Sequence, residues 1–270
     1  MKTAISAAIL VLPLMIAGCD DPKADAPPAA SAVALPSAAP APTPTPAPSA
    51  STPPAPAFVK KTLADCKPHP ATVEFDDAAL ENEVRRKLSK EKGPITPADL
   101  GTIKSINLAQ APVNQIDPCI YPMFTSMKDL FLGPGDYDDL SPLQKLTNIE
   151  TIRAALSRVK DLHPIEGLKR MDRLDISHTL VSDDDLKAVG SLTNLTELML
   201  DEDSISDLTP VANLKKLEKL SIKKTRVQNL APIAGIKTLK YLYIAEAPIS
   251  DISPVQPLVA GPSRLKIIRE

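Results

Sequence analysis

The chain has 270 residues and a formal net charge of −2, from 31 basic and 33 acidic side chains. This near balance excludes a general attraction of the whole molecule to nucleic acid. There is no Trp and only 3% of residues are aromatic, so any sizeable core has to be aliphatic. The 29 prolines fall into a dense N-terminal cluster and a phased set further along the chain.

Residues 1–18 have the layout of an export signal. Lys2 supplies the basic start, and the apolar stretch from Ala4 to Ala17 is too short for a comfortable transmembrane helix. The run LMIAGC at 14–19 resembles a bacterial lipobox. The resemblance implies cleavage before Cys19 and lipidation of that cysteine, which would anchor the exported protein to a membrane of the cell envelope. The alternative is an ordinary signal peptide followed by a coincidental cysteine.

Residues 19–58 are predicted to form a disordered tether rich in Pro and Ala. Twelve prolines lie between Pro22 and Pro56, and large apolar residues are almost absent. Such a segment buries too little apolar area to offset the entropy of ordering it. Extended in a polyproline II conformation at about 3 Å per residue, it would reach roughly 100 Å. The tether would therefore hold a folded domain well away from a membrane.

Residues 103–258 are periodic, with seven units that repeat every 22 or 24 residues. The leading apolar residues of the units are Ile103, Met127, Ile149, Met171, Leu195, Leu217 and Leu239. An apolar-x-apolar pair follows three residues after each of them, and this alternation predicts a short strand with one buried face. Six of the seven units also carry an in-phase proline, which suits a turn that needs no strand hydrogen bond.

The pattern resembles the internalin-type leucine-rich repeat of bacteria. The segments at 206–214 and 250–258 are very similar to the convex turn of that family. The resemblance implies an α/β solenoid, a right-handed superhelix with short parallel strands on its concave face and an N-terminal helical cap. Each unit is too small to bury its apolar face alone, so it has to stack on its neighbours.

The remaining segments are predicted to close the two ends of the solenoid. Residues 59–102 would form a strap and a cap helix with Asp76 as its N-cap, ended by the Gly93-Pro94 pair, and residues 259–270 a closing strand. Cys119 is expected to point inward from the first convex turn, where a disulfide to Cys66 would staple the strap. Two free thiols are the alternative. In the fourth unit, Ser182 and Asp185 form a capping box that predicts a true α-helix.

The sequence departs from the family pattern at the bend after each strand, where the family usually has Asn. This position holds Ala111, Gly135, Ser157, Thr179, Asp203, Thr225 and Ala247. Ser, Thr and Asp can still hydrogen-bond to backbone groups there, whereas Ala and Gly cannot. The two ends of the array are therefore predicted to be looser than its middle.

No arrangement of residues points to catalysis, to a cofactor or to a metal ion. His69, His163 and His178 fall in unrelated phases of the repeat, and no Gly-rich phosphate loop is present. We therefore expect a protein that is not an enzyme. The concave sheet is the predicted binding surface, because aromatic residues, Met and Arg are enriched in protein interfaces.

The residues expected at this surface are Phe131, Arg153, Asp175, Glu197, Met199, Asp201, Lys219, Lys223, Tyr241 and Tyr243. The sequence thus predicts a monomeric, lipid-anchored protein that binds a protein partner through this face. An envelope-organising protein that binds glycan or peptidoglycan is the second interpretation. An enzyme is the third interpretation, which the absence of a catalytic arrangement disfavours. For the face itself, the alternative is that exposed strand positions simply favour such residues and that their charges neutralise one another across the strands.

Overall fold

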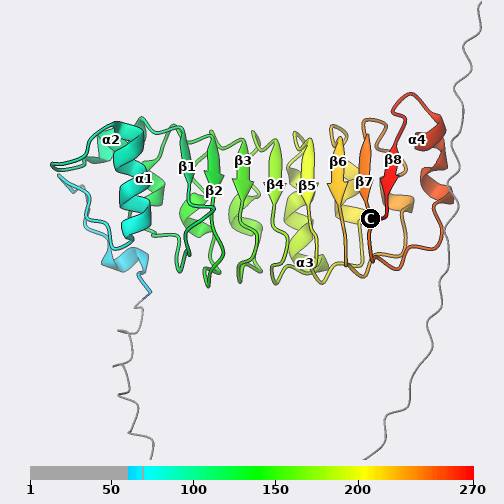
Figure 1. The fold of residues 1–270 in the computed structure, drawn as a ribbon, viewed down its shortest axis with the longest axis horizontal. Helices are drawn as coiled ribbons and strands as arrows, with labels where there is room; N and C mark the ends of the chain where they lie inside the picture. The colour runs from blue at the N-terminus through cyan, green and yellow to red at the C-terminus, as the bar shows by residue number, and fades with distance from the viewer. Residues whose placement is uncertain (1–59, 69) are drawn as a thin grey trace, which may run out of the picture. The chain divides into compact units, whose positions relative to one another are not determined.

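The computed structural model describes residues 60–68 and 70–270. The predicted export signal, Cys19 and the tether lie outside the described residues. In the described part, eight parallel strands form one open sheet in chain order (Figure 1). They are β1 (Ser105–Asn107), β2 (Asp129–Phe131), β3 (Thr151–Arg153), β4 (Arg173–Asp175), β5 (Glu197–Met199), β6 (Lys219–Ser221), β7 (Tyr241–Tyr243) and β8 (Lys266–Ile268). The predicted leucine-rich-repeat solenoid is confirmed.

The middle residue of every strand points into the core and lies in register with its equivalent in the next strand. Leu198 pairs with Leu220, and Leu220 pairs with Leu242. All three are completely buried. Burial of an aliphatic side chain of this size contributes roughly 1.5–3 kcal/mol, so the repeated ladder supplies most of the force that stacks the units.

The convex side consists mainly of short 3-10 turns, and five of them have an in-phase proline as their second residue. In these five turns an Asp or Asn lies two residues before the first residue of the turn, and its side chain accepts that residue's backbone N–H. Ser141 N donates to Asp139 Oδ1 at 2.7 Å, and Thr209 N donates to Asp207 Oδ1 at 2.8 Å. The turns are η2 (Tyr121–Met123), η3 (Ser141–Leu143), η4 (His163–Ile165), η5 (Lys187–Ser191), η6 (Thr209–Asn213), η7 (Ala231–Ile233) and η8 (Ser253–Val255).

The fourth unit has the predicted α-helix, although it is only one turn long. Helix α3 (Asp183–Leu186) begins at a capping box in which Ser182 and Asp185 bond reciprocally, and η5 continues it. Asp183 also accepts hydrogen bonds from the backbone N and the hydroxyl of Ser206 in the next unit, at 2.8 and 2.6 Å. The cluster of aspartates here thus caps a helix and links two units.

The N-terminal end is covered by α1 (Ala78–Leu88) and α2 (Pro97–Gly101), and α4 (Gln256–Ala260) precedes β8. The predicted N-cap is wrong by one residue. Asp77 accepts from Ala79 N and Leu80 N at 2.8 and 3.2 Å, whereas Asp76 forms an ion pair with Lys61. The helix also ends earlier than predicted, because Ser89 takes a left-handed conformation with φ of 51°.

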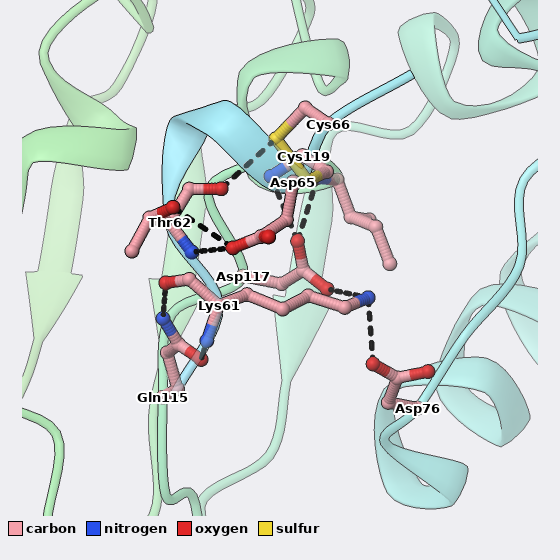
Figure 2. Close-up of a disulfide and its surroundings, with 9 residues drawn as sticks. Lys61, Thr62, Asp65, Cys66, Asp76, Gln115, Asp117 and Cys119 are labelled. Carbon is pink, nitrogen blue, oxygen red and sulfur yellow. Dashed lines mark hydrogen bonds and ion pairs between the residues drawn. A yellow bond between two sulfur atoms is a disulfide. The ribbon is translucent and has the colours of Figure 1, made fainter. Parts of the chain in front are cut away.

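A disulfide between Cys66 and Cys119 joins the strap to the first repeat (Figure 2). Around it, the Lys61 ammonium pairs with Asp76 and Asp117 at 2.6 and 3.1 Å, and the side chain of Gln115 bonds both backbone groups of Lys61. Cys119 is only half-buried, so the expectation that it fills the inward position is wrong. The neighbouring Ile120 is buried in its place.

The backbone at the bend after each strand is accommodated in different ways along the array, by side-chain hydrogen bonds in some units and by a close approach of two units in another. Thr225 Oγ1 donates to Ile222 O at 2.8 Å, and Ser157 Oγ donates to Ala154 O at 2.8 Å. At Gly135 a Cβ atom would collide with the backbone of Val113, so glycine is required there by the close approach of two units. That the ends are looser than the middle stays a prediction.

Asp203 occupies the bend of the fifth unit and is 3% exposed. Its Oδ1 accepts from Thr179 N and Thr179 Oγ1 at 2.8 and 2.9 Å, but Oδ2 has no partner among the described residues. Burial raises the pKa of Asp203 to about 7; the Thr179 bonds oppose this shift, and the carboxylates of Asp175 and Asp201 add to it. A buried carboxyl of this kind disfavours the folded state once it ionises.

Asp203 is predicted to make the fold less stable as the pH rises from about 4 to about 7. The unfolded carboxyl loses its proton near 3.8 while the folded one keeps it up to about 7, so the unfolded state binds fewer protons in this window. Asp203→Asn keeps an oxygen for Thr179 and cannot ionise. Thermal melts should show the variant gaining stability over the parent at pH 8 but not at pH 4. Asp136→Asn, at an exposed position, serves as the control, and equal gains at both pH values would contradict the prediction.

Removal of the disulfide is predicted to destabilise the domain. The two cysteines are 53 residues apart. Opening a loop of that length costs about 4 kcal/mol on the chain-entropy estimate. The Cys66→Ala/Cys119→Ala variant should therefore unfold at a lower urea concentration than the parent, and a reducing agent should lower the parent's midpoint to that of the variant. A reducing agent without effect on the parent would show that the two thiols are not paired.

Candidate functional site

The concave face is built from the first and third residues of each strand, which point away from the core. Pairing in register turns these positions into two columns that run across the whole sheet. Phe131, Arg153, Asp175, Met199 and Tyr243 lie in one column. Glu197, Lys219 and Tyr241 lie in the other, while Asp201 and Lys223 follow just after β5 and β6. The structure thus brings all ten predicted residues to one surface.

The charged residues of this face pair with one another across neighbouring strands. Lys219 Nζ lies 2.7 Å from Glu197 Oε1, Arg153 Nε lies 3.1 Å from Asp175 Oδ2, and Lys223 Nζ lies 3.1 Å from Asp201 Oδ2. The three predicted cations therefore already have carboxylate partners. This pairing leaves the face nearly neutral. Partly exposed ion pairs contribute little to stability, so they do not make the face rigid.

Each aromatic ring of the face has a cation above it. Arg153 lies over Phe131 at 6.0 Å, Lys219 over Tyr243 at 5.6 Å and Lys266 over Tyr241 at 5.8 Å. Tyr241 is still 39% exposed. The three rings are thus oriented by cation–π contacts and keep area that a partner could cover. Lys266 was missed in the sequence because the closing strand was not assigned outward positions.

A shallow hollow of about 140 Å³ lies over β2 to β5. Five predicted residues line it: Phe131, Arg153, Asp175, Glu197 and Met199. Three further outward residues complete its wall, and composition alone did not single them out: Asp129, Thr151 and Arg173. Asp201, Lys219, Lys223, Tyr241 and Tyr243 lie outside it. The predicted surface therefore divides into a hollow near its centre and an aromatic, basic end at β6 to β8.

A second and larger cavity of about 530 Å³ lies between the strap and the first two repeats. Leu63, Ile116 and Pro142 contribute apolar surface to it, and the disulfide forms part of its wall. No repeat motif predicts this cavity, because it exists only where the strap crosses the convex turns. Cys66 was the one residue in the sequence that indicated such a crossing.

A column of left-handed residues borders the concave face from the third repeat to the seventh. The members are Leu156, His178, Glu202, Lys224 and Glu246, with φ between 54° and 63°. The Glu202 carboxylate lies 2.9 Å from His178 Nε2 and 3.2 Å from Lys224 Nζ. Non-glycine residues rarely adopt this conformation, so the column stores backbone strain along the rim of the face.

The part of the chain that the structure describes contains no group of three His, Cys, Asp or Glu residues placed to hold a metal ion. Within the same residues, no helix has the length and apolar character needed to cross a membrane.

Comparison with known proteins supports the fold. No protein-family model and no curated protein matches the sequence. Among solved structures, an internalin (InlF) from Listeria monocytogenes is 24% identical, with a TM-score of 0.64 over 72% of this chain and 56% of its own. Internalin C2 (InlC2) from the same organism is 24% identical, with a TM-score of 0.59 over 73% of this chain and 94% of its own.

The chain thus spans little more than half the length of the InlF structure. At this level of identity the likeness concerns the fold alone. The fold is a leucine-rich repeat of the kind seen in these internalins.

Leu156→Asn is predicted to stabilise the domain by about 1 kcal/mol, because Asn tolerates the left-handed conformation better than Leu. Leu180→Asn is a matched control: the two leucines are 54% and 56% exposed, and only Leu156 has a positive φ. Urea denaturation of the three proteins would show the effect. A gain of the same size in the control would mean that removal of exposed apolar surface, rather than relief of strain, is responsible.

Proposed function

We propose that this protein is a non-catalytic binding protein that holds a protein partner on its concave face. The observation that carries the proposal is the sheet itself. Eight outward residues on β2 to β7, and two that follow β5 and β6, lie on one surface with exposed aromatic area and a hollow at its centre. Of the charged residues around the hollow, Arg153 is paired with Asp175 and Glu197 with Lys219, so a partner would not have to neutralise these groups. Burial of Phe131, Met199 and the tyrosines would then supply the affinity.

We further propose that the protein is exported and lipid-anchored through Cys19, with residues 19–58 as the tether. The sequence of the first 19 residues supports this proposal. A membrane-held base and a long Pro-rich spacer would let the concave face meet partners anywhere between the envelope surface and the full reach of the tether. The anchor is tested by mass spectrometry of the mature N-terminus, where an unmodified Cys19 would contradict it.

The binding proposal is tested by crosslinking and mass spectrometry on intact cells. Phe131→Ala/Tyr241→Ala/Tyr243→Ala removes aromatic area from the face. Leu63→Ala/His163→Ala/Lys187→Ala is the matched control, because these side chains are exposed and lie away from the sheet. We expect one reproducible protein partner that crosslinks to β2–β7, is lost in the first variant and is retained in the second.

Glycan binding is the second candidate, favoured by the exposed ring of Tyr241 beside Lys266. Protein crosslinks that survive the aromatic substitutions, together with loss of binding to isolated peptidoglycan, would overturn the first proposal in favour of this one.

A further inference from the structure

The turns that lead into the strands form one long edge of the solenoid, on which cations collect. We define the leading edge as the six exposed residues Lys145, Lys169, Arg170, Lys215, Lys216 and Lys237. They lie in the turns before β3, β4, β6 and β7, along one side of the sheet, and the turn before β5 lies between the two pairs (Figure 1). The sequence shows them only as scattered charges, because they recur in some units and not in others.

Hydrogen bonds show that these turns touch one another in succession. Arg170 Nη1 donates to Asn148 Oδ1 at 2.8 Å, and Lys216 Nζ donates to Asn194 Oδ1 at 2.7 Å. Asn194 Nδ2 in turn donates to Lys169 O at 2.7 Å. The next unit continues the ladder, since Thr238 Oγ1 donates to Lys215 O at 2.9 Å. The cations therefore belong to one continuous strip.

The charge of the strip is not compensated. None of the six cations has a carboxylate within 4.0 Å among the described residues, and the partners of Arg170 and Lys216 are neutral amide oxygens. The acidic residues that follow the turns have other partners: Glu150 pairs with Lys128, Asp172 with Arg173 and Glu218 with Lys240. Only the exposed Glu166 borders the strip with a free carboxylate among these residues. On the concave face, by contrast, Arg153, Lys219 and Lys223 are paired with carboxylates.

We propose that the leading edge docks on the surface of an anionic lipid bilayer. Five of the six side chains occupy two adjacent equivalent positions in stacked repeats, one or two residues before the leading apolar residue, and Lys145 lies four residues before it. The strip runs from the turn before β3 to the turn before β7, which is four strand spacings or about 20 Å. The strip lies on the flank of the solenoid and not on its curved face, and a flat surface can therefore meet all of it. Lipid headgroups need only positive charge to be held, and each Lys or Arg close to such a surface strengthens the attraction.

The composition of the edge disfavours other partners. Its other exposed residues are small and polar, such as Thr147 and Thr193, so it has no apolar anchor of the kind that dominates protein interfaces. It also has no aromatic ring on which the bases of a nucleic acid could stack. Docking on this flank would leave the concave face accessible, so the domain could bind a membrane and a protein partner at the same time.

The test is vesicle flotation of the full chain carrying Cys19→Ser. The vesicles are anionic (phosphatidylcholine with phosphatidylglycerol) or neutral (phosphatidylcholine alone). Residues 1–59 are the same in every variant, so a difference between variants on the anionic vesicles reports the contribution of the folded domain. We expect more protein on the anionic vesicles, with release at high salt. Lys169→Glu/Arg170→Glu/Lys215→Glu/Lys216→Glu should lower the bound fraction at least about tenfold, given the gain per cation at such a surface.

The control changes the same number of charges away from the strip: Lys92→Glu/Lys160→Glu/Arg226→Glu/Arg269→Glu. These four cations are exposed and also lack carboxylate partners among the described residues. Circular dichroism would establish that both variants are folded, and the corresponding Gln variants replace them if either is not. Equal loss in strip and control variants, or no preference of the parent for anionic vesicles, would overturn the proposal. So would binding of the parent to polyglutamate or an oligonucleotide without binding to vesicles.

A fluorophore locates the docked edge independently. In the Cys19→Ser background, Thr193→Cys places a single free thiol on the leading edge, and Gln228→Cys places one on the opposite flank; both positions are exposed. An environment-sensitive label should shift toward the blue on anionic vesicles at Thr193→Cys and not at Gln228→Cys. The reverse pattern would show that another face meets the membrane.

Discussion

The stacking of one unit on the next is the interaction on which the whole structure depends. No unit can cover its own aliphatic face, so each strand residue such as Leu220 is buried only because Leu198 and Leu242 lie on either side of it. This requirement fixes the strand register, and the register in turn decides which side chains face outward. The concave face and the leading edge are both consequences of a constraint that acts on the core.

The contrast between these two surfaces follows from their geometry. On the concave face, strands lie close enough for a cation to reach a carboxylate on its neighbour, as Lys219 reaches Glu197. On the leading edge, the neighbouring turns offer amides and hydroxyls, so Lys216 is held by Asn194 and its charge remains. A chain with a net charge of only −2 can therefore carry a strongly basic strip.

The repeat period was sufficient to predict the solenoid, the strand positions and the residues of the concave face, because a periodic core leaves little freedom to the backbone. The helix of the fourth unit followed from its capping box. Local details were harder. The N-cap moved from Asp76 to Asp77 because Lys61, fifteen positions before Asp76 in the strap, forms an ion pair with Asp76. A contact over this separation has no local signal in the sequence. The hollow, the strap cavity and the leading edge are formed by contacts between units. The residue types at individual positions do not predict such contacts.

The proline-led turns of the convex side also set how the solenoid bends. A 3-10 turn is narrower than an α-helix, so units built from such turns can lie almost as close together on their outer side as their strands do on the inner side. Among the described repeats, α3 inserts a wider helical turn in the fourth unit, and α4 does so after η8 at the end of the seventh. Within the array, curvature should therefore concentrate around the fourth unit and remain slight in the units built from 3-10 turns alone. A slightly curved concave sheet of this kind suits an elongated or flat ligand better than a globular ligand that the solenoid would have to surround.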